Sequence, residues 1–165
     1  MIHPHDYSKN LNKRQKQEAD PVDFLHVVGW REWVSLTDLG ISRIKAKVDT
    51  GARTSALHAY DVHEYTDGHR TMVRFKVHPF QKNTHSVRFA RAEVVDKRLI
   101  RDSGGRVTLR PVILTTVRVG DLNWVIELTL VNRDQMGFRM LLGRQALRGN
   151  LLVNPQKSYL LGKQN

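Results

Sequence analysis

Two short segments of this 165-residue chain place residues that could do acid–base chemistry at tight turns of the backbone. In the first, Asp49-Thr50-Gly51-Ala52 follows a run of alternating apolar and polar residues, so a carboxylate stands on a glycine turn at the end of a predicted strand. In the second, nearer the C-terminus, Leu141-Leu142-Gly143-Arg144 joins apolar residues to a glycine. A carboxylate in the first setting can accept a proton from water, and two carboxylates that share one proton can serve as base and acid in a hydrolysis.

The residues after Asp49 have the types that the catalytic loop of an aspartic peptidase needs. Thr50 has a hydroxyl that can lock the loop by donating a hydrogen bond, and Gly51 lets backbone N–H groups approach the carboxylate. The alternative is a purely structural Asp-Thr-Gly turn, which is common at strand ends. Because the chain has a single Asp-Thr-Gly, a catalytic pair of this kind requires a homodimer in which Asp49 of each copy meets at a two-fold axis.

The elements that position these segments are predicted to be β-strands. Period-two alternation is clear where Val73, Phe75 and Val77 are separated by polar residues. We expect strands at 26–35, 43–49, 56–65, 70–78, 86–100, 106–119, 122–131 and 150–153, with 157–161 closing the chain and one short helix near 144–148. Short strands joined by hairpin turns favour an all-β fold, a small closed β-barrel with one short C-terminal helix.

Length and composition favour one domain. Residues 1–24 are polar, contain Pro4 and Pro21, and predict a flexible N-terminal arm, whereas residues 25–165 predict the barrel domain. No run of about 18 apolar residues could span a membrane, and the chain start lacks the apolar stretch of a secretory signal. The absence of Cys excludes disulfides and thiolate chemistry and suits a reducing compartment. We therefore expect a soluble, cytoplasmic protein that does not bind membranes.

The charge balance predicts an anionic partner. The chain has 27 Lys and Arg against 16 Asp and Glu, a net charge of +11, and the acidic and basic residues of positions 1–27 cancel, so the excess lies in the predicted barrel. Such a field attracts an acidic peptide, a nucleic acid or an anionic surface, and the alternative is a basic surface that only aids solubility. We do not expect nucleic acid, because Trp30, Trp33 and Trp124 fall in strand patterns that core packing explains better than base stacking.

The segment from Val48 to Ala52, followed by Leu57-His58-Ala59, resembles one protein family in particular. Further stretches carry the same resemblance, from about Gly29 to Leu161: Arg106 to Val112, Leu130 to Asp134, Met140 to Leu147 and Leu152 to Tyr159. On these residues the chain is similar to the RimK-associated ATP-dependent zinc proteases, a retropepsin-like family. The resemblance implies a small closed β-barrel, an aspartic endopeptidase loop at Asp49, and association with ATP-grasp ligases that add glutamate to proteins.

The chain departs from the retroviral pattern in a way that suggests a substrate. Retroviral enzymes pair an acidic residue, four positions after the catalytic Asp, with the Arg that follows the later Gly; here these positions hold Arg53 and Arg144. Two neighbouring cations need an acidic partner or a bound anion. We expect Arg53 and Arg144, together with Arg110 and His58, to bind an acidic or glutamylated peptide beside Asp49. The alternative function is a non-catalytic binding module for an acidic partner in a glutamate-ligase pathway.

Neither zinc nor ATP is supported by a motif in this chain. No His-Glu-x-x-His is present, and His58 and His63 are an odd number of residues apart, which places them on opposite faces of a predicted strand. No phosphate-binding Gly-x-x-x-x-Gly-Lys-Ser/Thr loop occurs. We therefore expect no metal and no cofactor.

Overall fold

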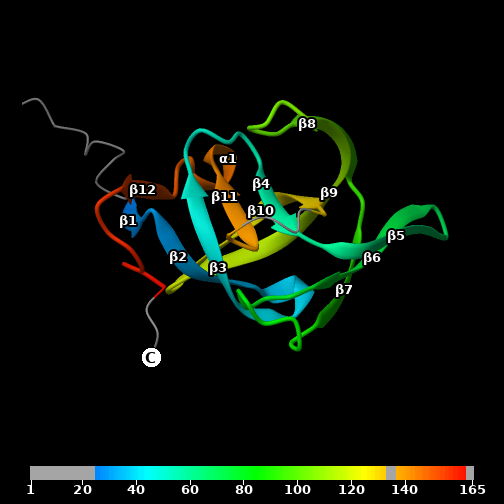
Figure 1. Cartoon of the computed structure of the whole chain (residues 1–165), viewed down its shortest axis with the longest axis horizontal. Coiled ribbons are helices and arrows are strands. Elements are labelled where there is room, and N and C mark those ends of the chain that lie inside the picture. Colours follow the sequence, from blue (N-terminus) through cyan, green and yellow to red (C-terminus); the bar gives the residue numbers. More distant parts are fainter. Residues whose placement is uncertain (1–24, 133–136, 163–165) are drawn as a thin grey trace, which may run out of the picture.

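The computed structural model describes residues 25–132 and 137–162, and strands make up most of it (Figure 1). The strands are β1 His26–Gly29, β2 Arg31–Leu36, β3 Ile41–Asp49, β4 Ser55–His58, β5 Tyr60–Asp67, β6 Arg70–Val77, β7 Arg88–Glu93, β8 Asp96–Arg101, β9 Val107–Val119, β10 Leu122–Val131, β11 Met140–Gly143 and β12 Leu151–Asn154. The helices are a single 3-10 turn, η2 Thr37–Leu39, and a single α-helical turn, α1 Arg144–Leu147. The arm predicted at 1–24 lies outside the described residues.

Six strands close into a barrel. The neighbours run in the order β10, β4, β11, β3, β2 and β9, and a further pairing of β9 with β10 completes the ring. The strand β8 pairs with the first part of β9, residues 107–112, as an antiparallel hairpin. The prediction of an all-β closed barrel with one short C-terminal helix is therefore confirmed.

Alternating side chains from the barrel strands fill one core. Val34 and Leu36 on β2, and Ile44 and Ala46 on β3, are almost fully buried, and the residues between them are more accessible. The core also includes apolar residues from the later strands: Leu57, Phe75, Ile113, Val117, Leu128, Met140 and Leu142. This inward-facing set fixes the register of the strands, because a shift by one residue would move every side chain to the opposite face.

Two small sheets lie outside the ring. The antiparallel strands β5, β6 and β7 form a three-stranded sheet that extends to the right of the barrel in Figure 1, and β1 pairs in parallel with β12. Predicted strand 86–100 is thus divided between two sheets, as β7 and β8, and predicted strand 56–65 is divided between β4 and β5. The strand β11 was not predicted as such, because its four residues are too few to show a period.

The strand predicted at 157–161 is wrong, and the carboxylate of Glu32 explains why. Glu32 is fully buried and accepts hydrogen bonds from the backbone N–H groups of Gly29, Leu160 and Gly162 at 2.8, 2.7 and 2.9 Å. These donors of the C-terminal segment therefore bond to a side chain instead of to a neighbouring strand. In the described residues no helix has the length and apolar character needed to cross a membrane.

Candidate active site

The Asp49 loop connects β3 to β4 at one end of the barrel. Asp49 is the last residue of β3, is half-buried, and its Oδ1 accepts hydrogen bonds from the N–H groups of Gly51 at 3.0 Å and Ala52 at 3.1 Å. A Cβ on Gly51 would lie 3.3 Å from that same oxygen, a close contact that glycine avoids. The turn itself therefore holds the carboxylate in one orientation.

The second segment noted in the sequence lies directly beside this loop. The strand β11 runs parallel to β3 with Gly143 opposite Asp49, and the Gly143 N–H donates to the buried Ser55 Oγ at 3.0 Å. A Cβ on Gly143 would come within 2.5 Å of the Thr54 carbonyl carbon, so the close approach of the two segments requires glycine. The Arg144 N–H then donates to the Ala52 carbonyl at 2.7 Å, which ties the loop to the start of α1.

The tip of the β8–β9 hairpin completes a pocket over the loop. In Figure 1 the hairpin lies at the top of the molecule, beside the β3–β4 connection, and it contributes Ile100 through Ser103 together with Arg110 to the pocket wall. The cavity measures about 440 Å³. Its other lining residues come from the loop and from β4, β10 and β11: Asp49, Gly51, Ala52, Arg53, Thr54, Ala56, Thr129, Val131 and Leu141.

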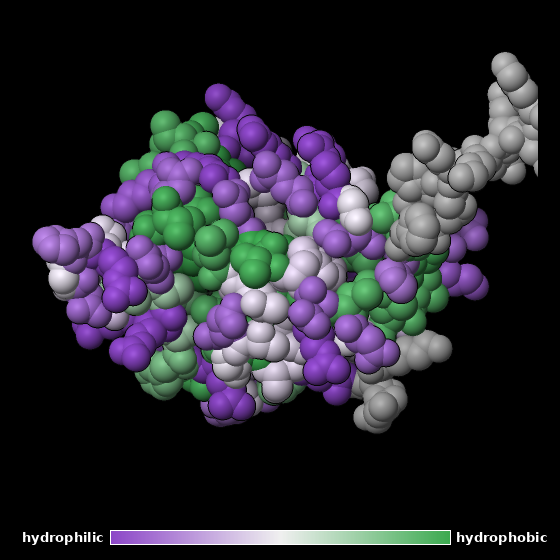
Figure 2. All heavy atoms as spheres, turned by 180° about the vertical axis from the view of Figure 1, so that it is seen from behind, coloured by the Kyte–Doolittle hydropathy of each residue, from purple (hydrophilic) through white to green (hydrophobic). Residues whose placement is uncertain are grey.

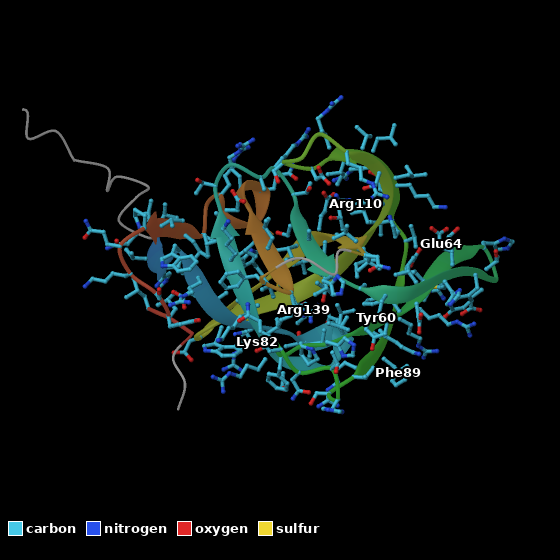
Figure 3. The ribbon with its side chains drawn as sticks, in the orientation of Figure 1. Tyr60, Glu64, Lys82, Phe89, Arg110 and Arg139 are labelled. Carbon is cyan, nitrogen blue, oxygen red and sulfur yellow. The ribbon has the colours of Figure 1, made fainter. Side chains whose placement is uncertain are left out.

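The structure brings five of the eight predicted site residues into this pocket: Asp49, Gly51, Ala52, Arg53 and Arg110. Arg110, which is labelled in Figure 3, is buried, and its Nε donates to Thr108 Oγ1 at 2.9 Å, whereas Arg53 is exposed.

The three other predicted residues do not line the pocket. Thr50 is exposed, and its carbonyl accepts a hydrogen bond from Arg144 Nη1 at 3.1 Å, so Arg144 contacts the loop without lining the pocket. His58 is 2% exposed and lines a different cavity with Tyr60, His78 and Arg139.

Sequence reasoning missed a second carboxylate in the pocket, that of Asp102. This residue sits in the hairpin turn, where its Oδ1 accepts hydrogen bonds from the N–H groups of Gly104 at 2.9 Å and Arg106 at 3.0 Å. In the sequence, Asp102-Ser103-Gly104-Gly105 shows the signal of a turn, and the structure confirms one. Nothing local in those residues indicates that the turn folds back over Asp49.

An ion cluster anchors the hairpin to the barrel. Arg98 on β8 donates to both carboxylate oxygens of Glu127 on β10, at 2.5 and 3.0 Å, and to Asp96 at 2.6 Å. Hydrogen bonding to Arg98 lowers the pKa of both carboxyl groups below its ordinary value. The charge of Arg53 contributes further to the lowered pKa of Glu127, so Glu127 offsets part of the cationic charge beside the pocket.

A zinc ion does not fit the described residues. Within 25–132 and 137–162, no three His, Cys, Asp or Glu side chains lie together so that they could hold a metal. The pocket at Asp49 has two carboxylates and no histidine among its lining residues.

The chain matches a protein-family model over almost its whole described length. The model of the RimB-like family, described as retropepsin-like aspartic endopeptidase RimB, matches residues 27–164. The chain belongs to this family. The RimB-like match covers the barrel, the Asp49 loop, the β8–β9 hairpin and β11 together.

Curated relatives of the RimB-like chain are considerably longer proteins. A probable alpha-L-glutamate ligase of Shewanella halifaxensis is 41% identical over 139 residues, which are 84% of this chain and 30% of that protein. A protein of the same name from Parasynechococcus marenigrum is 43% identical over 136 residues, 82% of this chain and 29% of the relative. The RimB-like chain therefore spans less than a third of the length of these relatives.

A solved structure shares the fold. The Legionella pneumophila protein Lpg0085, of unknown function (DUF785), superposes with a TM-score of 0.70 at 28% identity, covering 82% of this chain and 98% of that one. The RimB-like barrel thus also occurs as nearly the whole of a solved chain.

Proposed function

We propose that this RimB-like domain is an aspartic-type peptidase centred on Asp49 that acts on acidic, glutamylated peptides or proteins. One observation carries the proposal: a carboxylate held by the N–H groups of Gly51 and Ala52 faces a pocket that also contains Arg53 and Arg110. The retropepsin-like family supports the reaction, and the names of the ligase relatives support a glutamate-containing substrate.

The proposed reaction is hydrolysis of a peptide bond by two carboxyl groups. Asp49 removes a proton from water, the water oxygen bonds to the peptide carbonyl carbon, and the second carboxyl group, in its protonated form, donates to the carbonyl oxygen. The C–N bond then breaks as the leaving amine takes a proton, which leaves an acid and an amine as products.

The second carboxyl group has two sources in this scheme. A homodimer would contribute Asp49 of the other copy, by the symmetry that the single Asp-Thr-Gly requires. Asp102 would contribute it within one chain, because it lines the same pocket. The oligomeric state of the active protein, together with an Asp102→Asn variant, distinguishes the two sources.

Cations in the pocket select the substrate in this proposal. Arg53 and Arg110 line the cavity, and a guanidinium group can bind a carboxylate through two parallel hydrogen bonds. Arg144 acts through the loop, by way of its hydrogen bond to the Thr50 carbonyl.

A non-catalytic binding module is the second candidate. The observation that favours it is that Asp49 Oδ1 already accepts two backbone hydrogen bonds, which gives the carboxylate a structural role in the turn. In that case the same pocket would bind an acidic partner without cleaving it.

We also propose association with a glutamate ligase. The support is that the relatives named as ligases contain a region like this chain as less than a third of their length. The outer face of the β8–β9 hairpin suits such a contact, because Leu99 and Leu109 lie opposite each other in register and are 73% and 62% exposed. Apolar side chains gather in patches on the face of the molecule shown in Figure 2.

The test of the proposed function is a cleavage assay on peptides that end in several glutamates, from acidic to neutral pH. Wild type should release shortened peptides, and Asp49→Asn should not. Binding of the peptides by both proteins without cleavage would support the binding module instead.

A further inference from the structure

The three-stranded sheet β5–β6–β7 has one face that the proposed peptidase does not use. On β6, Val73, Phe75 and Val77 are buried against the barrel, and the alternate residues Arg74 and Lys76 face the other way. The sheet is separate from the ring in its pairing, and Figure 3 shows Phe89 far from Arg110 in the view. None of the residues lining the hollow on this face lines the Asp49 pocket.

Two arginines oppose each other on this face. The register pairs His63 on β5 with Arg74 on β6, and Arg74 with Arg91 on β7, so three basic side chains form one row across the strands. All three are exposed, and neither arginine forms an ion pair with any residue in the described ranges. Like charges directly opposite each other destabilise a sheet, and a bound anion would remove that cost.

The adjacent row adds an exposed aromatic ring. Phe89 lies opposite Lys76 and is 75% exposed, the largest exposed fraction of any large apolar residue in the described part of the chain. Lys76 lies 5.3 Å from the centre of that ring and forms an ion pair with Asp61 at 2.7 Å. The two rows border a hollow of about 590 Å³, which is lined by Asp61, His63, Arg74, Phe75, Lys76, Phe89, Ala90 and Arg91.

We infer that this face, defined by His63, Arg74, Lys76, Phe89 and Arg91, is a binding site for single-stranded RNA. Arg74 and Arg91 bind phosphates, and the open ring of Phe89 stacks on a base, which is the combination by which sheet surfaces hold unpaired nucleotides. His63 and Asp61, which line the same hollow, can hydrogen-bond a ribose 2′-hydroxyl, which favours RNA over DNA. An acidic peptide would pair with the arginines but would leave Phe89 without a stacking partner.

The inference departs from the expectation drawn from the sequence, which weighed the three tryptophans alone. Those rings are half-buried and engaged; Trp124 Nε1, for example, donates to the Ala146 carbonyl at 3.0 Å. The basic and aromatic residues of the new face come from three strands, and they meet only through the register of the sheet.

Fluorescence anisotropy with a labelled oligouridylate tests this site. The whole chain should bind it, and Arg74→Ala/Arg91→Ala should weaken binding at least about tenfold. The slope of log affinity against log salt should fall by about 1.4, because each phosphate contact to a single strand contributes about 0.7. Phe89→Ala should weaken binding about fivefold with the slope unchanged, because stacking is not ionic.

Arg148→Ala/Lys157→Ala is the matched control, since it removes two exposed cations from elsewhere on the surface and should keep wild-type affinity. Equal losses in this control and in Arg74→Ala/Arg91→Ala would overturn the site, because binding would then follow net charge alone. Equal affinity for oligodeoxythymidylate, full displacement by a glutamate octapeptide, or no binding by wild type at low salt would also overturn it. All these residues are exposed, so no variant should unfold at a lower temperature than wild type, and Arg74→Ala/Arg91→Ala, which removes the opposed pair of charges, should raise the midpoint slightly. A loss of binding without a lowered midpoint then belongs to the site.

Discussion

At the scale of single residues, the candidate site depends on glycines that let backbone segments meet. Asp49 could be singled out from the sequence, because its Asp-Thr-Gly follows an alternating run and stands together with the later Leu141-Leu142-Gly143-Arg144 segment. Arg53 and Arg110 were predicted to lie beside Asp49, and both line its pocket. His58 was predicted to lie there too, but it lines a separate cavity, which could not be predicted. His58 lies on β4, whose four residues are all buried, so no alternation shows which way it points.

Replacing Arg53 with Ala should weaken binding of a glutamate octapeptide about tenfold at low salt, since a charge-assisted contact of about 1.4 kcal/mol is lost. The difference in affinity between wild type and Arg53→Ala should narrow at higher salt, because salt screens the charge of this exposed side chain. Isothermal titration calorimetry measures it. Lys47→Ala is the control, because Lys47 is an exposed cation on β3 that does not line the pocket, and equal effects of the two substitutions would contradict the assignment.

Replacing Gly143 with Ala should destabilise the fold by roughly 1–3 kcal/mol, the usual cost of forcing an added group into a packed site. The new Cβ would meet backbone atoms of Thr54 and Ser55, which cannot rotate away. Urea unfolding gives the free energy. Gly137→Ala makes the same change where no atom lies within 4 Å, so a similar loss in both variants would show that the contact with the Asp49 loop is not the cause.

At the scale of elements, the β8–β9 hairpin is the part of the site that sequence patterns revealed least. The run 86–100 shows continuous β signals, and the break at residues 94–95, where the chain passes from one sheet to the other, has no Gly or Pro to mark it. Tertiary pairing decides the break: Val94 donates to the Thr71 carbonyl on β6, whereas Val95 donates to the Val112 carbonyl on β9. Local signals therefore predicted extended backbone here, but neither the break between β7 and β8 nor the partners of the two strands.

The Arg98 cluster should make the attachment of the hairpin sensitive to acid. Because the folded-state pKa values of Glu127 and Asp96 lie below the ordinary 4.5 and 3.8, their stabilisation is present above those values and is lost as the pH falls through the lower, folded-state ones. Arg98→Met should therefore unfold at lower urea concentration than wild type at pH 7, and the gap should shrink below about pH 4.5.

The control for that experiment is Arg118→Met. Arg118 donates its Nε to the Gly120 carbonyl at 3.0 Å, a group that does not titrate, so the gap between this variant and wild type should not change with pH. A gap for Arg98→Met that is equally independent of pH would contradict the role of its two carboxylates.

At the scale of the whole molecule, the closed barrel can be predicted from the sequence, whereas the distribution of charged and apolar residues over its surface cannot. Alternation and hairpin turns predict the barrel, because burying one face of each strand leaves few other arrangements. The composition gives a net charge of +11 but not its placement, and the structure brings some of the cations to the Asp49 pocket and others to the β5–β6–β7 sheet. The exposed apolar residues of the β8–β9 hairpin could not be recognised from the sequence either, because they lie in strands whose apolar and polar residues alternate regularly.

The apolar face of the hairpin should matter for the proposed association with a glutamate ligase. Leu99→Ser/Leu109→Ser should weaken binding to such a ligase at least about tenfold in calorimetric titration, because the cross-strand leucine pair would no longer be removed from water. Val27→Ser/Leu152→Ser changes a comparable exposed cross-strand pair, on β1 and β12, and should bind like wild type. Equal binding by both double variants would contradict this surface.

The central claim is that Asp49 makes this RimB-like domain a peptidase for acidic substrates, and one measurement tests it most directly. Mass spectrometry should follow peptides ending in several glutamates, and matched peptides ending in glutamines, with wild type and Asp49→Asn. The account predicts cleavage of the glutamate series by wild type, a loss of at least about a thousandfold in kcat/KM on Asp49→Asn, and poor cleavage of the glutamine series. Equal rates for wild type and Asp49→Asn, or no cleavage by wild type at any pH, would contradict it.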